Sequence, residues 1–106
     1  MILTTTASLE GYRIESYEGI VSSEIVMGAN IVRDLMAGVR DVIGGRSGAY
    51  EEKLAEARHM ATEGIKKQAE SLGAEAIVGI RYDIETIGQG MLICVATGTA
   101  VRVVCQ

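Results

Sequence analysis

The chain has 106 residues, which is the length of one domain, residues 1–106, with one modest hydrophobic core. Hydrophobic residues make up 48% and charged residues 23%, a composition that excludes a disordered chain. The net charge of −4, with scattered Lys and Arg, disfavours nucleic acid as a partner. No apolar run reaches the roughly 18 residues of a membrane span, and the first six residues do not resemble a signal peptide. We therefore expect a cytoplasmic protein, with no membrane partner, in which Cys94 and Cys105 are reduced thiols.

The first third of the chain predicts strands. Residues 2–6 form a short strand, and Glu10-Gly11 forms a turn. Residues 12–27 form a strand region with alternating side chains, which a break near Glu18-Gly19 divides into two strands in one interpretation.

Helical spacing of apolar residues then predicts two helices. The first runs from an N-cap at Asn30 to the stop at Gly44-Gly45. The second begins near Ala49 or Tyr50, with Ser47 as its cap, and ends at Gly73. Its apolar stripe consists of Leu54, Ala57, Ala61, Ile65, Ala69 and Leu72. Gly64 interrupts this helix at a cost in helix propensity, so we expect close packing there.

Two strands complete an α+β order of β-β-(β)-α-α-β-β, with the helices on an antiparallel sheet. In the first of these strands, one face is predicted to carry Ala76, Val78, Ile80, Tyr82 and Ile84. The last strand, from residue 91 to 104, is apolar or small on both faces. A single layer of helices leaves one face free, and the set expected there is Leu92, Cys94, Ala96, Gly98 and Ala100. That face is too apolar for water, so we expect a second copy of the chain to cover it.

Several blocks of sequence resemble a known family over essentially the whole chain. They are Val26-Met27-Gly28-Ala29-Asn30, Gly44-Gly45-Arg46-Ser47-Gly48-Ala49-Tyr50-Glu51, Leu72-Gly73-Ala74-Glu75-Ala76-Ile77-Val78-Gly79 and Gly98-Thr99-Ala100-Val101. Together they resemble the YbjQ-like family, which is labelled as a heavy-metal-binding domain and whose molecular function is not established. The resemblance implies a small subunit of dodecin-like type that assembles into a ring, with a homopentamer as the expected form.

A metal site is only weakly indicated by the residues themselves. Heavy metals prefer paired thiolates, and the chain has no Cys-x-x-Cys motif. The weak candidates for metal ligands are His59, Glu63 and Cys94. The favoured interpretation makes Cys94 a small core residue and places His59 and Glu63 on a solvated helix face. A divalent metal ion is therefore the alternative cofactor, and no catalytic residue or organic cofactor site is assigned.

Charged residues near the first predicted helix suggest other contacts. Arg33-Asp34 and Arg40-Asp41 recur after two helical turns and are interpreted as a salt-bridged interface stripe. Arg46 and Ser47, beside the start of the second helix, are interpreted as part of a turn between helices or as an interface contact, with a small-anion site as the alternative. The leading hypothesis is a non-enzymatic cytoplasmic homo-oligomer that binds an unknown ligand. Its alternatives are a heavy-metal-binding protein and an enzyme whose active site forms between subunits.

Overall fold

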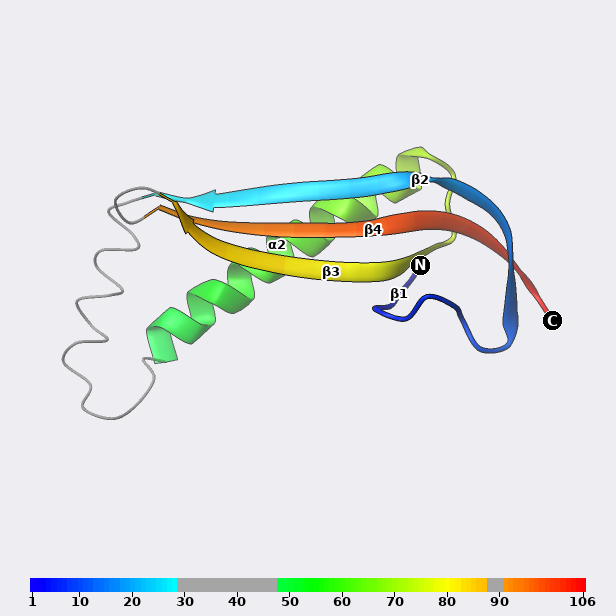
Figure 1. Cartoon of the computed structure of the whole chain (residues 1–106), viewed down its shortest axis with the longest axis horizontal. Coiled ribbons are helices and arrows are strands. Elements are labelled where there is room, and N and C mark those ends of the chain that lie inside the picture. The colour runs from blue at the N-terminus through cyan, green and yellow to red at the C-terminus, as the bar shows by residue number, and fades with distance from the viewer. Residues whose placement is uncertain (29–47, 88–90) are drawn as a thin grey trace.

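The structure is a computed structural model, and it describes residues 1–28, 48–87 and 91–106. The described part of the chain forms the strands β1 (Ile2–Leu3), β2 (Tyr12–Met27), β3 (Ala76–Ile87) and β4 (Met91–Cys105) and the helix α2 (Gly48–Ser71). The α+β class is thereby confirmed, with one layer of helix on one layer of sheet (Figure 1). The predicted first helix, residues 30–44, and the turn at Gly88-Gln89-Gly90 lie outside the described residues.

The sheet is mixed, with the order β1-β3-β4-β2. β4 lies between β2 and β3 and pairs with both in antiparallel fashion. β1 pairs with β3 in parallel, with Ile2 opposite Ala76 and Leu3 opposite Ile77. The expectation of a purely antiparallel sheet is therefore wrong at this edge, because the short first strand joins β3 rather than its neighbour in sequence.

β2 is one continuous strand of 16 residues, not two. The residues near the expected break hold two register shifts instead, one between Ile14 and Ser16 and one between Tyr17 and Gly19. Gly19 has a φ of 141°, which glycine adopts at little cost. Such shifts increase the local twist of a strand, and β2 curves at this end of the sheet (Figure 1).

A bulge reverses the side-chain alternation of β3. The register with β4 shifts between Val78 and Arg81, and Gly79 between them has a φ of 63°. Ala76 and Val78 consequently pack with Val101 in one cluster, whereas Ile80 joins the cluster beneath the helix. The prediction that Ala76 to Ile84 alternate on one face is therefore wrong, because the extra residue exchanges the two faces of the strand.

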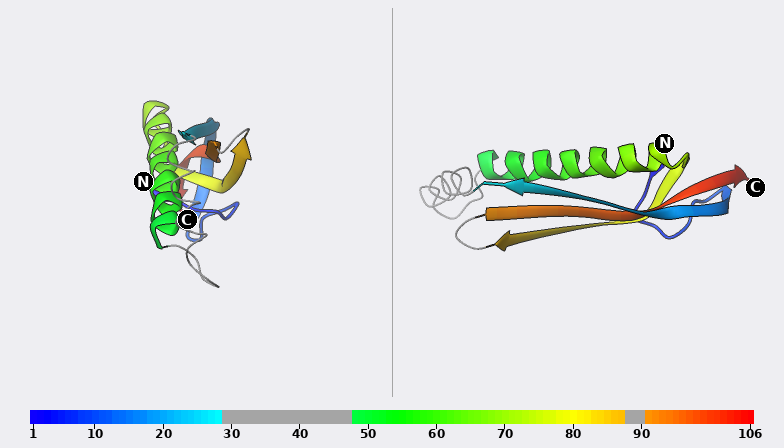
Figure 2. Two further views of the ribbon diagram at one scale, coloured as in Figure 1. Left: turned by 90° about the vertical axis from the view of Figure 1, so that its left-hand side faces the viewer. Right: turned by 90° about the horizontal axis from the view of Figure 1, so that it is seen from above.

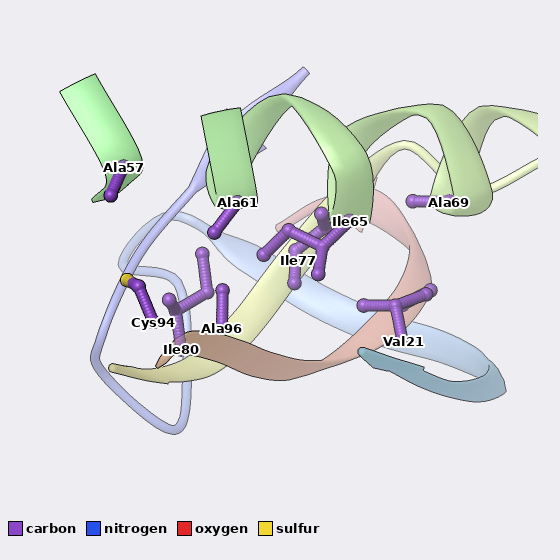
Figure 3. Packing of buried hydrophobic residues seen from close by; sticks show 10 residues of the cluster. Val21, Ala57, Ala61, Ile65, Ala69, Ile77, Ile80, Cys94 and Ala96 are labelled. Atoms are coloured by element: carbon purple, nitrogen blue, oxygen red, sulfur yellow. The ribbon is translucent and has the colours of Figure 1, made fainter. Parts of the chain in front are cut away.

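Small residues of α2 form the core against the sheet. Ala57, Ala61, Ile65 and Ala69 of the predicted stripe are buried, and Figure 3 shows them above Val21, Ile77, Cys94 and Ala96. The two ends of the predicted stripe differ, because Leu54 is half-buried and Leu72 follows the end of α2 and is exposed. The buried residues of β4 beneath the helix are Leu92, Cys94, Ala96, Gly98 and Ala100. The face that we expected to be free is thus the covered one, because its small side chains let the helix lie close to the sheet.

α2 crosses the sheet obliquely, behind the strands in Figure 1 and on one side only in Figure 2. Its 24 residues span about 36 Å, whereas the 16 residues of β2 extend over about 50 Å. Two polar contacts fix this path. The hydroxyls of Thr62 and Tyr82 are 2.6 Å apart on the β3 side, and Gln68 bonds the backbone of Ser22 on the β2 side. Nothing in the described helix is apolar enough over sufficient length to cross a membrane.

Candidate functional site

The face of the sheet opposite α2 carries exposed apolar side chains. On β2 it carries Ile20 and Val26, whose side chains are 83% and 50% exposed. Register places these residues opposite Thr99 and Ile93 of the central strand. We call this surface the open face. Its described members are Ile20, Ser22, Glu24 and Val26 of β2, Ile93, Val95, Thr97 and Thr99 of β4, and Arg81, Asp83 and Glu85 of β3.

The open face has an apolar middle and a charged border. Ile93 and Val95 are half-buried within the central strand, although no described helix lies above them. Arg81, Asp83 and Glu85 follow one another at alternate positions of β3 and are all exposed. At the end of the sheet near the termini, Leu9 packs against the cluster of Ala76, Val78 and Val101. The remainder of the face resembles an interface, in which apolar residues are surrounded by polar ones.

The candidate metal ligands are not brought together. Cys94 lies beneath the helix in the same cluster as Ala57 and Ala61. His59 follows Ala57 by two positions, and Glu63 follows Ala61 by two, so each points about 200° away around the helix axis. His59 is exposed and Cys94 is fully buried. One ion therefore cannot contact both side chains within a single chain.

The environment of Cys94 is that of a core thiol. Burial raises the pKa of the Cys94 thiol, and the positive charge of Arg58 offsets part of this rise. Cys94 and Cys105 are both free, and Cys105 is exposed at the end of β4. The prediction of Cys94 as a small core residue is confirmed, and a neutral thiol in this position is a poor metal ligand.

A small apolar pocket lies between the N-terminal half of α2 and the end of β2. It has a volume of about 170 Å³ and is lined by Ile25, Val26, Met27, Lys53, Glu56, Ala57 and Met60. Lys53 and Glu56 form an ion pair of 3.1 Å among these residues. Ligand sites usually have about 300–1,000 Å³, so this pocket is too small for most organic ligands. The sequence did not reveal it, because Met27 and Met60 meet only through the oblique path of the helix.

The charged candidates of the predicted first helix and its loop lie outside the described residues. They are Arg33, Asp34, Arg40, Asp41, Arg46 and Ser47. Their assignment to an interface or an anion site stays a prediction.

A family model described as "Putative heavy-metal-binding" matches residues 1–104. The chain belongs to the YbjQ family. Relatives in this family include UPF0145 proteins from Halalkalibacterium halodurans, 59% identical over 96% of this chain and 95% of that protein, and from Anoxybacillus flavithermus, 55% identical over 96% and 97%. A solved structure from Pediococcus pentosaceus, a protein of unknown function in the DUF74 family, is 19% identical with a TM-score of 0.59 and covers 98% of both chains. This likeness supports the fold of the YbjQ chain.

The heavy-metal description of the YbjQ family can be compared with the donor atoms on this chain. Among the residues that the structure describes, no three His, Cys, Asp or Glu side chains come close enough together to hold a metal ion. All three Cys and His side chains of the sequence lie within these ranges, and they are dispersed over the core, the outer helix face and the strand end. The described residues of one chain therefore do not fit a soft-metal site.

Proposed function

We propose that this YbjQ chain is a subunit of a non-enzymatic cytoplasmic homo-oligomer that associates through its open face and binds a ligand still to be identified. A ring of five subunits is the form that the family resemblance implies. The observation that carries the proposal is the exposure of apolar side chains on the open face, above all Ile20 and Val26.

Burial of the apolar side chains of the open face would stabilise an assembly more than ion pairs at its charged border would. Fully burying one Ile or Val side chain contributes about 1.5–3 kcal/mol, whereas an exposed ion pair contributes only about 0–1 kcal/mol. Ile20, which is almost fully exposed in its own chain, gains this energy only if another surface covers it, and Val26 can gain the part that its half-exposed position leaves. The charges of Arg81, Asp83 and Glu85 then orient the subunits at the border of the contact.

Sedimentation equilibrium of the wild-type chain and of Ile20→Lys tests this proposal. Ile20 makes little contact within its own chain, so the substitution leaves the subunit folded and lowers the mass of the assembly. Lys67→Glu, an exposed charge change on the outer side of α2, is the control and keeps the wild-type mass. A wild-type mass equal to the 11.3 kDa subunit would contradict the proposal.

Metal binding is the second candidate, and the description of the family model favours it. Equilibrium dialysis against zinc, copper and cadmium, with elemental analysis under reducing conditions, separates the two functions. Stoichiometric retention that is lost in Cys94→Ala or His59→Ala would assign a metal site between subunits, since one chain does not place these residues together.

A further inference from the structure

The outer edge of β2 is open to pairing with strands of other molecules, which can lead to aggregation. β4 pairs with one side of β2, and among the described strands none pairs with the other side. Residues 20–27 combine several β-branched apolar side chains with a single charge, that of Glu24. An exposed edge strand of this composition is a template for the addition of further strands from other molecules.

Two structural features can protect this edge from the addition of further strands. The first is a pair of register shifts, which acts on only half of the edge. The register shifts near Ser16 and Gly19 distort the N-terminal half of β2. Bulges of this kind turn an edge away from incoming strands. From Gly19 to Met27, however, the pairing with β4 is regular, so this half presents an undistorted row of backbone groups.

The second structural feature that can protect the edge is the side chain of Gln68 on α2. The backbone N–H of Ser22 donates to Oε1 of Gln68 at 3.0 Å, and Nε2 of Gln68 donates to the carbonyl of Ser22 at 2.6 Å. A residue of a neighbouring antiparallel strand makes the same two bonds with its partner. The carboxamide thus occupies the position of a strand residue.

The place of these two bonds along the edge is also informative. In an antiparallel strand, alternate residues direct both backbone groups to the same side. Ser22 therefore belongs to the outward row of Ile20, Ser22, Glu24 and Val26, and it lies within the regular half of β2. The buried neighbours Ile65 and Ala69 fix the helix on the sheet and hold Gln68 at this edge.

We propose that Gln68 acts as a strand substitute that closes the edge of β2 against strand addition by other chains. This role is separate from the proposed oligomer, because it concerns the edge of the sheet rather than its open face. It predicts that the loss of one carboxamide converts a stable subunit into one that adds strands without limit.

The test compares Gln68→Ala with Lys67→Ala, an exposed neighbour on the same helix. Amide hydrogen exchange by NMR measures the bond directly, and we expect the Ser22 amide to exchange about tenfold faster in Gln68→Ala, the factor that one ordinary hydrogen bond contributes. Thioflavin fluorescence and light scattering measure strand addition. We expect both signals to grow in Gln68→Ala at a concentration where the wild type and Lys67→Ala stay constant.

Gln68→Asn supplies the matched variant, because it keeps the carboxamide and shortens its reach by one methylene group. It should behave as Gln68→Ala in both measurements. Unchanged exchange at Ser22 in the two variants would overturn the hydrogen-bond pair and with it the proposal. Faster exchange without any growth of thioflavin-binding species would overturn the protective role. Both results are measured relative to the wild type, so they do not depend on whether the wild-type chain forms an oligomer.

Discussion

At Gly64 the helix α2 lies very close to β2. A Cβ atom at this position would lie 2.8 Å from the Cβ of Ser23, a separation that real Cβ atoms essentially never show. The expectation of close packing at Gly64 is therefore confirmed. Glycine lowers the helix propensity at this position, but any larger residue would push α2 away from β2.

Gly64→Ala should lower the free energy of unfolding by about 1–3 kcal/mol, since overcrowding outweighs the gain of about 1 kcal/mol in helix propensity. Urea unfolding followed by circular dichroism measures the change. Combining Gly64→Ala with Ser23→Gly should recover part of the loss, because Ser23→Gly removes the opposing Cβ. An increase in stability on Gly64→Ala alone would show that the helix can move away at no cost.

Cys94 should react slowly with thiol reagents, and its burial should make stability depend on pH. The raised pKa means that the folded state favours the neutral thiol. Below the ordinary value of 9.0 the thiol is neutral in both states and stability is unaffected. As the pH rises above that value, the unfolded thiol ionises first, so the free energy of unfolding falls.

The variant Cys105→Ala isolates this effect, because Cys94 is then the only thiol. Its unfolding free energy should fall more steeply between about pH 9 and 10 than that of the double variant Cys94→Ala/Cys105→Ala, which retains all the tyrosines and lysines. Rapid modification of Cys94 by a disulfide reagent in the folded protein at pH 8 would contradict the buried position.

Among the elements, β3 owes the arrangement of its side chains to a single residue, Gly79. The bulge at Gly79 places Val78 on the open side and Ile80 beneath the helix. A Cβ at Gly79 would meet nothing within 4 Å, but the φ of 63° is unfavourable for residues with a side chain. The requirement for glycine here is therefore one of backbone conformation alone.

Gly79→Ala should destabilise the chain by about 1–2 kcal/mol, the cost of a left-handed conformation for alanine. Gly28→Ala is the control, because a Cβ there also meets nothing and Gly28 has no positive φ. Gly79→Asn should cost less than Gly79→Ala, since asparagine tolerates this conformation better. Equal melting temperatures for all three variants would remove the conformational explanation.

The same elements show how far the sequence predicts this fold. The middle of the predicted stripe, Ala57, Ala61, Ile65 and Ala69, is buried because it repeats with the period of a helix, whereas its ends are not: Leu54 is half-buried and Leu72 is exposed. In β4 the alternation predicts two sets of side chains, and the prediction of which set lies uncovered is wrong. Alternation separates the faces without saying which of them a helix approaches, and the small side chains of Ala96 and Gly98 decide this. The bulge at Gly79 was missed because one glycine in a strand leaves the apolar pattern intact.

The candidate site was less predictable than the fold. Helical periodicity predicts His59 and Glu63 on a solvated helix face, and the structure exposes His59 but leaves Glu63 half-buried. The bonds between Gln68 and Ser22 could not be predicted, because they depend on the angle at which the helix crosses the sheet. No local pattern in the sequence encodes that angle.

At the scale of the whole molecule, the helix that the structure describes covers only one of the two faces of the sheet. The strands of 16, 12 and 15 residues are longer than most strands in globular proteins. α2 covers one face over part of this length, and the N-terminal segment covers one end of the other face. The proposed oligomer would supply the remaining cover, so we expect the stability of the fold to increase with protein concentration.

The central position of β4 affects how the protein folds during its synthesis on the ribosome. Among the described strands β4 comes after β2 and β3 in the sequence, yet both depend on it for most of their pairing, as Val21 with Gly98 and Ala76 with Val101 illustrate. On the ribosome, β2 and β3 therefore lack their long antiparallel partner until β4 has been synthesised. Contacts so distant in sequence slow folding, and the nascent chain carries the apolar strand β2 unpaired until β4 is available.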